Sequence, residues 1–343
     1  MFKLPTINER GKNLDFHIGT KTLTRKSAPY LVAEIGLNHN ADLEIGKRTI
    51  AKAKESGAHA VKFQTYRTEE FIDSSNPEVK FLFDIFKQYE LNESQHKEFQ
   101  KTALDLGLDF FSTPLCESAV DLLCELDVPV LKIASGDIVN LPLLNRSLQS
   151  GKPLIVSTGA ALPEEVTRAI SLFQKHQAEI CLLHCVSMYP TPLNKVNLQS
   201  IPFYLDTTDY VVGFSDHSDG TLASSVACGL GAVVFEKHFT LDRNLDGPDH
   251  GISMDPMTFS KLANDLKQSF EMGGVYGKNT HPEETGGWFY GRRSLYKKGN
   301  SILSLRPALH TKESNVLNSW ELNRIGDPSL LPEGPVHMTP KST

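Results

Sequence analysis

Two histidines stand where two neighbouring apolar segments end. His217 follows Ser215 and Asp216 at the end of one segment, and His238 closes the next. If the two segments are adjacent parallel strands, both imidazoles can reach one divalent ion, with water and substrate oxygens as further ligands. A lone inward histidine is more often a hydrogen-bonded structural residue. The spacing therefore fits a metal site and also fits a structural role.

Two lysines interrupt other apolar segments, near several hydroxyl groups. Lys62 and Lys132 carry the charges, and Thr113, Ser135 and Ser187 carry the hydroxyls at corresponding segment ends. Ammonium and hydroxyl groups together suit a phosphate or carboxylate ligand. We therefore expect an anion-binding pocket.

Two other roles are open for these lysines. Each could merely pair with a carboxylate, Glu34 or Glu236, on a neighbouring segment, because an unpaired buried charge is costly. One of them could instead form a Schiff base with a carbonyl substrate, as barrel aldolases do. Trapping with borohydride separates a Schiff-base enzyme from one that uses a metal.

One carboxyl and several histidines complete the set of candidate residues. Glu34 ends its segment within plausible reach of the other polar groups, which makes it the best candidate for proton transfer, as acid or as base. His39 follows in the next loop, where it either touches substrate or only caps the loop. His59, His96 and His176 fall in helical or helix-end contexts, and we predict that they face solvent.

All these residues occupy the same place in a repeated unit. Eight short runs rich in β-branched and aromatic residues are each followed by a helical pattern, which indicates βα units. The runs are residues 30–36, 60–66, 109–114, 130–135, 153–159, 180–186, 211–217 and 232–239. Eight parallel strands with helices between them predict an α/β fold, a closed (β/α)8 TIM barrel.

The polar residues cluster at the C-terminal ends of these runs, where barrel enzymes have their active sites. Alternation along each strand directs the apolar set toward the helices and the polar set toward the barrel mouth. We expect residues 1–29 to form an N-terminal extension with a hairpin at 14–28 that plugs the barrel bottom, and residues 30–275 to form the catalytic barrel. Residues 276–343 should form a short, irregular C-terminal tail.

The composition limits the possible partners. A net charge of −6 without a run of basic residues predicts no binding to nucleic acid. The longest apolar stretch, residues 222–235, is too short and too rich in small residues to span a bilayer, and the polar N-terminus is no signal peptide. We predict a cytoplasmic protein without a membrane partner. The five cysteines lack a CxxC pair and should be reduced core residues.

Several segments that carry these polar residues follow one another in a distinctive order. They are AEIGLNHN (33–40), VKFQTY (61–66), FSTP (111–114), LKIASGD (131–137), STGA (157–160), LLHCVSMYPTP (182–192), GFSDHSDG (213–220), FEKHFTLD (235–242) and GPDHGISMDP (247–256). Together they resemble the N-acetylneuraminate (sialic acid) synthase family. The resemblance runs from about residue 14 to residue 296.

The resemblance implies a metal-dependent condensation on a (β/α)8 barrel, with Mn²⁺ or Mg²⁺ as the cofactor. The substrates would be phosphoenolpyruvate and an N-acylated hexose, either N-acetylmannosamine or a relative. The products would be a nine-carbon 2-keto sugar acid and phosphate. The family also implies a homodimer in which a small antifreeze-like domain is swapped between the subunits.

Roles carry over by position. His217 and His238 resemble the metal ligands of the family. The residues that resemble its phosphoenolpyruvate pocket are Lys62, Thr113, Lys132, Ser135 and Ser187. The residues that resemble its sugar-binding and catalytic set are Glu34, Gln64, Tyr189 and Asp249. We expect Glu34, Tyr189 and Asp249 to act in catalysis and Gln64 to bind substrate.

The C-terminal segment departs from the family pattern. GRRSLY (291–296) resembles the start of the antifreeze-like domain, but residues 297–343 lack its regular pattern, so that this domain is expected to be truncated or absent. In the family this domain supplies an arginine to the partner's sugar site, and Arg306 is not assigned that role here. A second alternative function is therefore a catalytically impaired barrel that acts as a binding subunit. The costly polar cluster at the barrel mouth weighs against it.

Overall fold

The computed structural model describes residues 15–275, 277–279, 281–284, 290–298 and 301–306. The chain divides into two compact units, residues 1–274 and residues 275–343. Each unit is described by itself. Among the described residues, no helix is both long enough and apolar enough to cross a membrane.

The first unit is built around eight parallel strands that close into a barrel, which confirms the predicted fold. The strands are β3 (Tyr30–Gly36), β4 (Ala60–Thr65), β5 (Asp109–Pro114), β6 (Leu131–Ile133), β7 (Leu154–Ser157), β8 (Ile180–Cys185), β9 (Val211–Asp216) and β10 (Val234–His238). Each strand pairs with its sequence neighbours, and β10 pairs with β3 to close the ring. The C-terminal strand ends therefore meet at one mouth.

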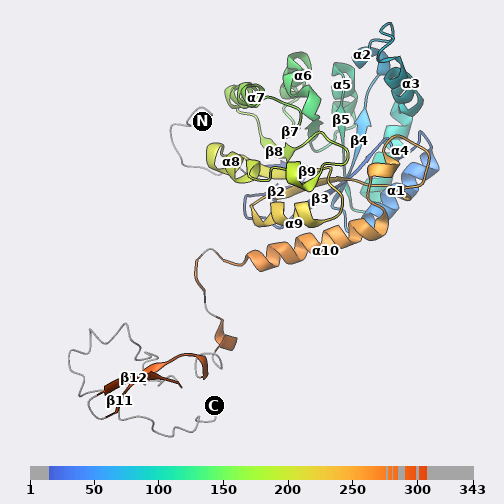
Figure 1. Cartoon of the computed structure of the whole chain (residues 1–343). Coiled ribbons are helices and arrows are strands. Elements are labelled where there is room, and N and C mark those ends of the chain that lie inside the picture. Colours follow the sequence, from blue (N-terminus) through green and yellow to red (C-terminus); the bar gives the residue numbers. More distant parts are fainter. Residues whose placement is uncertain (1–14, 276, 280, 285–289, 299–300, 307–343) are drawn as a thin grey trace. The chain divides into compact units, whose positions relative to one another are not determined.

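Helices alternate with the strands and surround the barrel (Figure 1). They are α1 (Leu43–Glu55), α2 (Thr68–Phe71), α3 (Lys80–Tyr89), α4 (Glu93–Asp105), α5 (Glu117–Glu125), α6 (Leu141–Gln149), α7 (Pro163–Lys175), α8 (Ser200–Thr207), α9 (Leu222–Gly229) and α10 (Pro256–Gly273). Short 3-10 turns lie at Ser135–Val139, Leu193–Lys195 and His250–Ile252.

Local sequence signals fix several helix ends. Asn92 and Gln95 form a capping box at the start of α4, with both hydrogen bonds at 3.0 Å. Asp255 caps α10 by accepting a hydrogen bond from Thr258 N at 2.8 Å, and Pro256 takes the first helical position. Such caps contribute about 1 kcal/mol each.

Aromatic side chains fill the layer between barrel and helices. Phe63 on β4 stacks on Phe99 of α4 at a centroid distance of 5.0 Å, and it contacts Phe110 on β5 at 5.4 Å. A Cβ atom on Gly46 of α1 would lie 2.3 Å from the Phe99 ring, so only glycine permits this helix contact. The packing holds α1 and α4 against the strands that carry Glu34 and Lys62.

The predicted N-terminal hairpin is present. It consists of β1 (Phe16–Ile18) and β2 (Lys21–Leu23), which pair antiparallel, and Phe16 and Ile18 are fully buried in the core. The Arg25 side chain that follows donates hydrogen bonds to the carbonyl oxygens of Tyr210 (3.0 Å) and Leu205 (2.9 Å). These contacts lie before β9, at the end of the barrel opposite the mouth.

In the second unit, the structure describes a 3-10 turn at Pro282–Glu284 and two antiparallel strands, β11 (Ser294–Lys298) and β12 (Ser301–Leu305). The Arg293 guanidinium donates a hydrogen bond to Ser304 O at 3.3 Å. Most of the predicted tail, including residues 307–343, lies outside the described residues.

Candidate active site

A cavity of about 810 Å³ opens at the C-terminal ends of the barrel strands. The structure brings all the predicted site residues together around it: Glu34, Lys62, Gln64, Thr113, Lys132, Ser135, Ser187, Tyr189, His217, His238 and Asp249. They come from strands β3, β4, β5, β6 and β10, or from the segments that follow β6, β8, β9 and β10. Because strand closure puts these ends side by side, residues far apart in sequence share one wall.

A second cavity of about 600 Å³ lies beside the first, toward α7 and α8. The described residues that line it include apolar side chains such as Phe203 and Val166 and no carboxylate. It shares Cys185 and Ser187 with the larger cavity. Since the cavity at the mouth holds the lysines, carboxylates and paired histidines, it is the candidate active site.

Lys62 is the centre of a buried ion cluster. Its ammonium lies 2.7 Å from Glu34 Oε2 and 3.6 Å from Glu236 Oε2, and it donates a hydrogen bond to Thr113 Oγ1 at 2.9 Å. Lys132 lies 3.5 Å from the other oxygen of Glu236. Both lysines therefore pair with carboxylates, as one interpretation of the sequence expected, and they also line the cavity.

The two carboxyls of this cluster differ in acidity. Burial raises the pKa of Glu34, the charge of Lys62 lowers it, and the charge of Glu236 raises it again. Burial would also raise the pKa of Glu236, but Lys132 and Lys62 together with the Ser215 hydroxyl hold it below its usual range. The cluster thus combines an ionised Glu236 with a Glu34 that can carry a proton.

A backbone irregularity brings Glu34 to its neighbours. The register between β3 and β4 shifts between Glu34 and Gly36, and Gly36 has φ +53°. A Cβ atom on Gly36 would lie 3.1 Å from Glu34 Oε1, 3.2 Å from Asp249 Oδ2 and 3.4 Å from Gln64 Nε2. Glycine therefore allows these three side chains to converge. Burial also raises the pKa of Asp249.

His217 and His238 lie side by side at the mouth, at the ends of the adjacent strands β9 and β10. Their ring centroids lie 5.7 Å apart, and the Tyr189 ring lies 4.1 Å from that of His217. His217 Nδ1 donates a hydrogen bond to Val186 O at 2.9 Å, so Nε2 is the nitrogen left for a ligand.

These two imidazoles fit a divalent cation. His238 Nδ1 is buried without a hydrogen-bond partner in the described part of the chain, and burial, with a smaller contribution from Lys62, lowers the pKa of His238 to about 4. A neutral imidazole is the form that binds metal. Among the described residues, no group of three or more His, Cys, Asp or Glu side chains could hold a metal ion. Further ligands to a bound cation would therefore have to be water or substrate oxygens.

The hydroxyl groups of the mouth meet above Gly159. Ser135 Oγ accepts a hydrogen bond from Gly159 N at 3.0 Å. A Cβ atom on Gly159 would lie 2.5 Å from Ser187 Oγ and 2.8 Å from Ser135 Oγ. This glycine therefore lets two hydroxyls converge on one place, which suits an anion, while its own amide holds the Ser135 hydroxyl.

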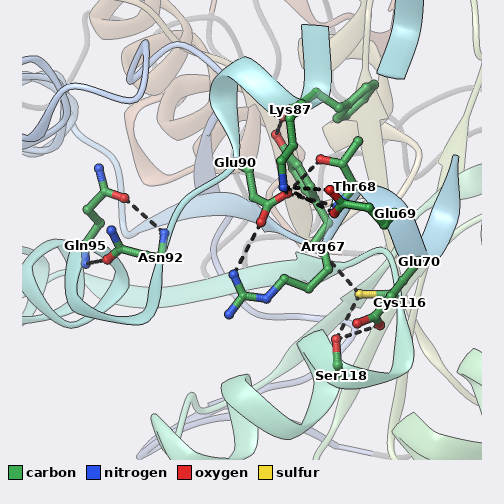
Figure 2. A network of polar contacts seen from close by, with 12 residues as sticks. Arg67, Thr68, Glu69, Glu70, Lys87, Glu90, Asn92, Gln95, Cys116 and Ser118 are labelled. Carbon is green, nitrogen blue, oxygen red and sulfur yellow. Dashed lines mark hydrogen bonds and ion pairs between the residues drawn. The ribbon is translucent and has the colours of Figure 1, made fainter. Parts of the chain in front are cut away.

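The connection between β4 and α4, which contains α2 and α3, adds an apolar wall that the sequence analysis missed. Phe71 and Phe86 line the cavity, and their rings meet edge to face at 5.1 Å. Glu90 fastens the connection (Figure 2): it accepts hydrogen bonds from Thr68 N (3.0 Å), Thr68 Oγ1 (2.8 Å) and Lys87 Nζ (3.0 Å). No polar strand end marks these residues in the sequence.

Comparisons with known proteins identify the family of this chain. The family model described as NeuB family matches residues 49–278. An uncharacterised protein of Methanocaldococcus jannaschii is 41% identical over 82% of this chain and 83% of its own length, and the N,N'-diacetyllegionaminic acid synthase of Legionella pneumophila is 38% identical over 70% and 72%. The chain belongs to the NeuB family.

The solved NeuB-like structures extend the match. The N-acetylneuraminic acid synthetase of Leptospira borgpetersenii, determined in complex with citrate, superposes with a TM-score of 0.75 at 32% identity and covers 80% of this chain and 94% of that one. The NeuB match includes every predicted site residue except Glu34, which precedes it.

Four histidines of this NeuB chain lie away from the cavity wall. His39 is fully buried against Phe63 and accepts a hydrogen bond from Ala41 N at 2.9 Å, so it caps its loop. His59 and His176 are exposed, as predicted. The prediction for His96 was wrong: it is fully buried and bonds Thr65 Oγ1 at 2.9 Å and Asn92 O at 2.9 Å, because α4 turns this face to the barrel.

Proposed function

We propose that the chain condenses phosphoenolpyruvate with an N-acylated hexose to form a nine-carbon 2-keto sugar acid and phosphate. The observation that carries the proposal is a single cavity in which two buried lysines, a protonatable Glu34 and two facing imidazoles meet. Membership in the NeuB family and the relatives named as acid synthases support it. The acceptor would be N-acetylmannosamine or a 2,4-diacetamido relative.

The lysines and hydroxyls would bind the anionic donor. Lys132 is buried, which lowers its pKa, and a carboxylate or phosphate placed beside it would favour the charged form. Thr113 already accepts a hydrogen bond from Lys62, and Ser135 and Ser187 converge nearby. These groups would neutralise charge on the departing phosphate.

Mn²⁺ or Mg²⁺ would be held by His217 and His238, and when bound it would polarise the aldehyde oxygen of the open-chain sugar. Tyr189 packs on the His217 ring and would limit its rotation. Gln64 and Asp249 converge with Glu34 on the same side of the cavity and would orient the sugar hydroxyls.

Glu34 would move the proton. In its protonated form it would deliver a proton to the aldehyde oxygen while C3 of phosphoenolpyruvate forms the new bond to the aldehyde carbon. The ionised carboxylate would then take a proton from the water that adds to C2. Collapse of this adduct would break the bond between C2 and the bridging oxygen while the proton of the C2 hydroxyl passes to the departing phosphate, so that phosphate leaves and the 2-keto acid remains.

A Schiff-base aldolase is the alternative enzyme. Burial lowers the pKa of Lys132, the direction that a nucleophilic amine needs, whereas carboxylates raise the pKa of Lys62 although burial opposes this. Treatment with borohydride in the presence of phosphoenolpyruvate and sugar separates the two reactions. Our proposal predicts full activity after treatment. Inactivation with a covalent adduct on a lysine would favour the aldolase.

The direct test is an assay of the purified protein with phosphoenolpyruvate, Mn²⁺ and a panel of N-acylated hexoses. One acceptor should yield phosphate and 2-keto acid in equal amounts, and EDTA should stop the reaction. Binding of phosphoenolpyruvate and Mn²⁺ without turnover on any acceptor would favour the impaired binding subunit. We also propose a homodimer, which sedimentation of the same sample would test.

A further inference from the structure

We propose that the buried ion pair between Lys237 and Asp216 positions His217 and His238, and thereby sets the affinity of the mouth for a divalent cation. The inference rests on the proposed metal role of the two histidines. Neither Lys237 nor Asp216 is among the described residues that line the cavity, so they would act through their neighbours and not by contact with substrate.

The pair lies directly behind the histidines. Asp216 and Lys237 are paired residues of adjacent parallel strands β9 and β10, and each precedes one histidine. Alternation turns them toward the helix layer while Ser215 and Glu236, which bond each other at 3.0 Å, face inward. The Lys237 ammonium lies 3.0 Å from Asp216 Oδ2, with 4% and 1% of the two side chains exposed.

Further hydrogen bonds close the arrangement. Asp216 accepts from Ser218 N at 2.8 Å, Ser218 Oγ at 2.7 Å and Ser224 Oγ at 2.6 Å. Lys237 also donates to Ser218 O. Because both residues that flank His217 are bound, its backbone is fixed relative to β10 and to α9.

The histidine backbones are held from the other side too. His217 O accepts from Thr191 N at 2.9 Å, and His238 O accepts from Met254 N at 2.9 Å. Within this frame, the ion pair joins the side chains of the last paired residues of β9 and β10.

Stability alone does not explain an ion pair at this place. Positions on the outer face of barrel strands usually hold apolar residues, as Phe214 and Phe235 do two residues earlier on the same strands. Apolar replacements of a buried ion pair are often neutral or stabilising. An ion pair with these further hydrogen bonds instead fixes the ends of β9 and β10 relative to each other, just before the two histidines. A cation site with two protein ligands requires such a fixed distance between them.

The test compares the double variant D216L/K237M with wild type and with F235L. The double variant removes both charges, whereas F235L lowers packing on the same face of β10 and leaves the pair intact. Mn²⁺ affinity is measured by electron paramagnetic resonance, and folding by thermal unfolding. We expect the double variant to fold and to bind Mn²⁺ about 10–100-fold more weakly, the range for residues that support metal ligands. Saturating Mn²⁺ should restore much of its turnover, and F235L should keep wild-type Mn²⁺ affinity.

Wild-type Mn²⁺ affinity in the folded double variant would overturn the inference. H217A and H238A distinguish failure of the positioning role from failure of the metal assignment. If only these two variants lose Mn²⁺ binding, the positioning role of the ion pair is wrong and the metal assignment stands. If they retain Mn²⁺ binding, both are wrong. If the double variant does not fold, Ser224→Ala removes one hydrogen bond to Asp216 and should weaken Mn²⁺ binding several-fold. Unchanged affinity there would also overturn the inference.

Discussion

Two buried ion clusters lie at the same end of the barrel, and they differ in how completely their charges are paired. In the inner cluster, Lys62 and Lys132 share Glu34 and Glu236 at distances from 2.7 to 3.6 Å and face the cavity. In the outer pair, Asp216 accepts three hydrogen bonds besides the contact with Lys237.

This difference indicates which of the charged groups can still bind a ligand. Glu34 Oε2 is buried with one partner, the Lys62 ammonium at 2.7 Å, whereas each oxygen of Asp216 has two partners, so the inner carboxyl leaves an acceptor position for a ligand. The Lys237–Asp216 pair is already bound by neighbouring groups, so its role would be to hold β9 and β10 together. Perturbed, incompletely satisfied charges are typical of functional sites. The inner cluster should therefore control chemistry and the outer pair geometry.

Lys62→Met should have the largest effect on the inner cluster. It leaves two buried carboxylates side by side, so we expect the free energy of unfolding to fall by about 3 kcal/mol or more and turnover to be lost. Chemical denaturation measures the first effect. Adding Glu34→Gln to this variant should recover part of the stability, since one of the two carboxylates is then neutral. If Lys62→Met has the same free energy of unfolding as the exposed control Lys267→Met, the proposed difference between the two clusters is wrong.

Lys132→Ala should act on the donor. Because it removes one cation from the anion pocket, we expect the KM for phosphoenolpyruvate to rise about 10- to 100-fold, the value of one charge-assisted hydrogen bond. The KM for the sugar should change little. Steady-state kinetics with each substrate varied in turn checks this, and equal increases in both constants would exclude a donor-specific role.

Glu34→Gln should change how stability depends on pH. Burial raises the pKa of Glu34, so its contribution to stability is fully present below the ordinary glutamate pKa of about 4.3 and is lost as pH rises through the raised value. The variant carries an uncharged amide at every pH and should therefore lose less stability than wild type between acid and neutral pH. Parallel pH profiles in urea titrations would argue against a raised pKa.

Glu90→Gln should give the smallest effect, since this residue lies outside both clusters. It weakens the contacts that fasten the connection carrying Phe71 and Phe86, at a cost of about 1 kcal/mol. Thermal unfolding measures the loss. Glu69→Gln, which removes only an exposed contact to Lys87, is the matched control and should leave the thermal unfolding temperature unchanged. Equal behaviour of the two variants would show that Glu90 does not fasten the connection.

The sequence predicts the barrel well because its signals are local. The bounds of β3 and β5 coincide with the predicted runs, and the polar residues at strand ends gather around one cavity as expected. The repeated βα pattern is enough to predict that the strands close into a barrel. Closure in turn places the C-terminal strand ends around one mouth.

The remaining features depend on tertiary contacts that no local pattern encodes. The register shift at Gly36 becomes visible only when β3 and β4 are paired. His184 sits among polar strand ends in the sequence but donates to Val196 O at 2.7 Å on the helix side. Phe71 and Phe86 reach the cavity from a connection without a recognisable signal, and His96 is buried by the packing of α4.

We propose that the inner cluster supports condensation with cleavage of the bond between C2 and the bridging oxygen of phosphoenolpyruvate. Phosphoenolpyruvate labelled with oxygen-18 at that bridging position tests it directly, in a reaction with Mn²⁺ and an N-acylated hexose that is a substrate. Mass spectrometry should find the label in the released phosphate and one phosphate for each 2-keto acid. Label in the keto acid would mean attack at phosphorus and would contradict the account.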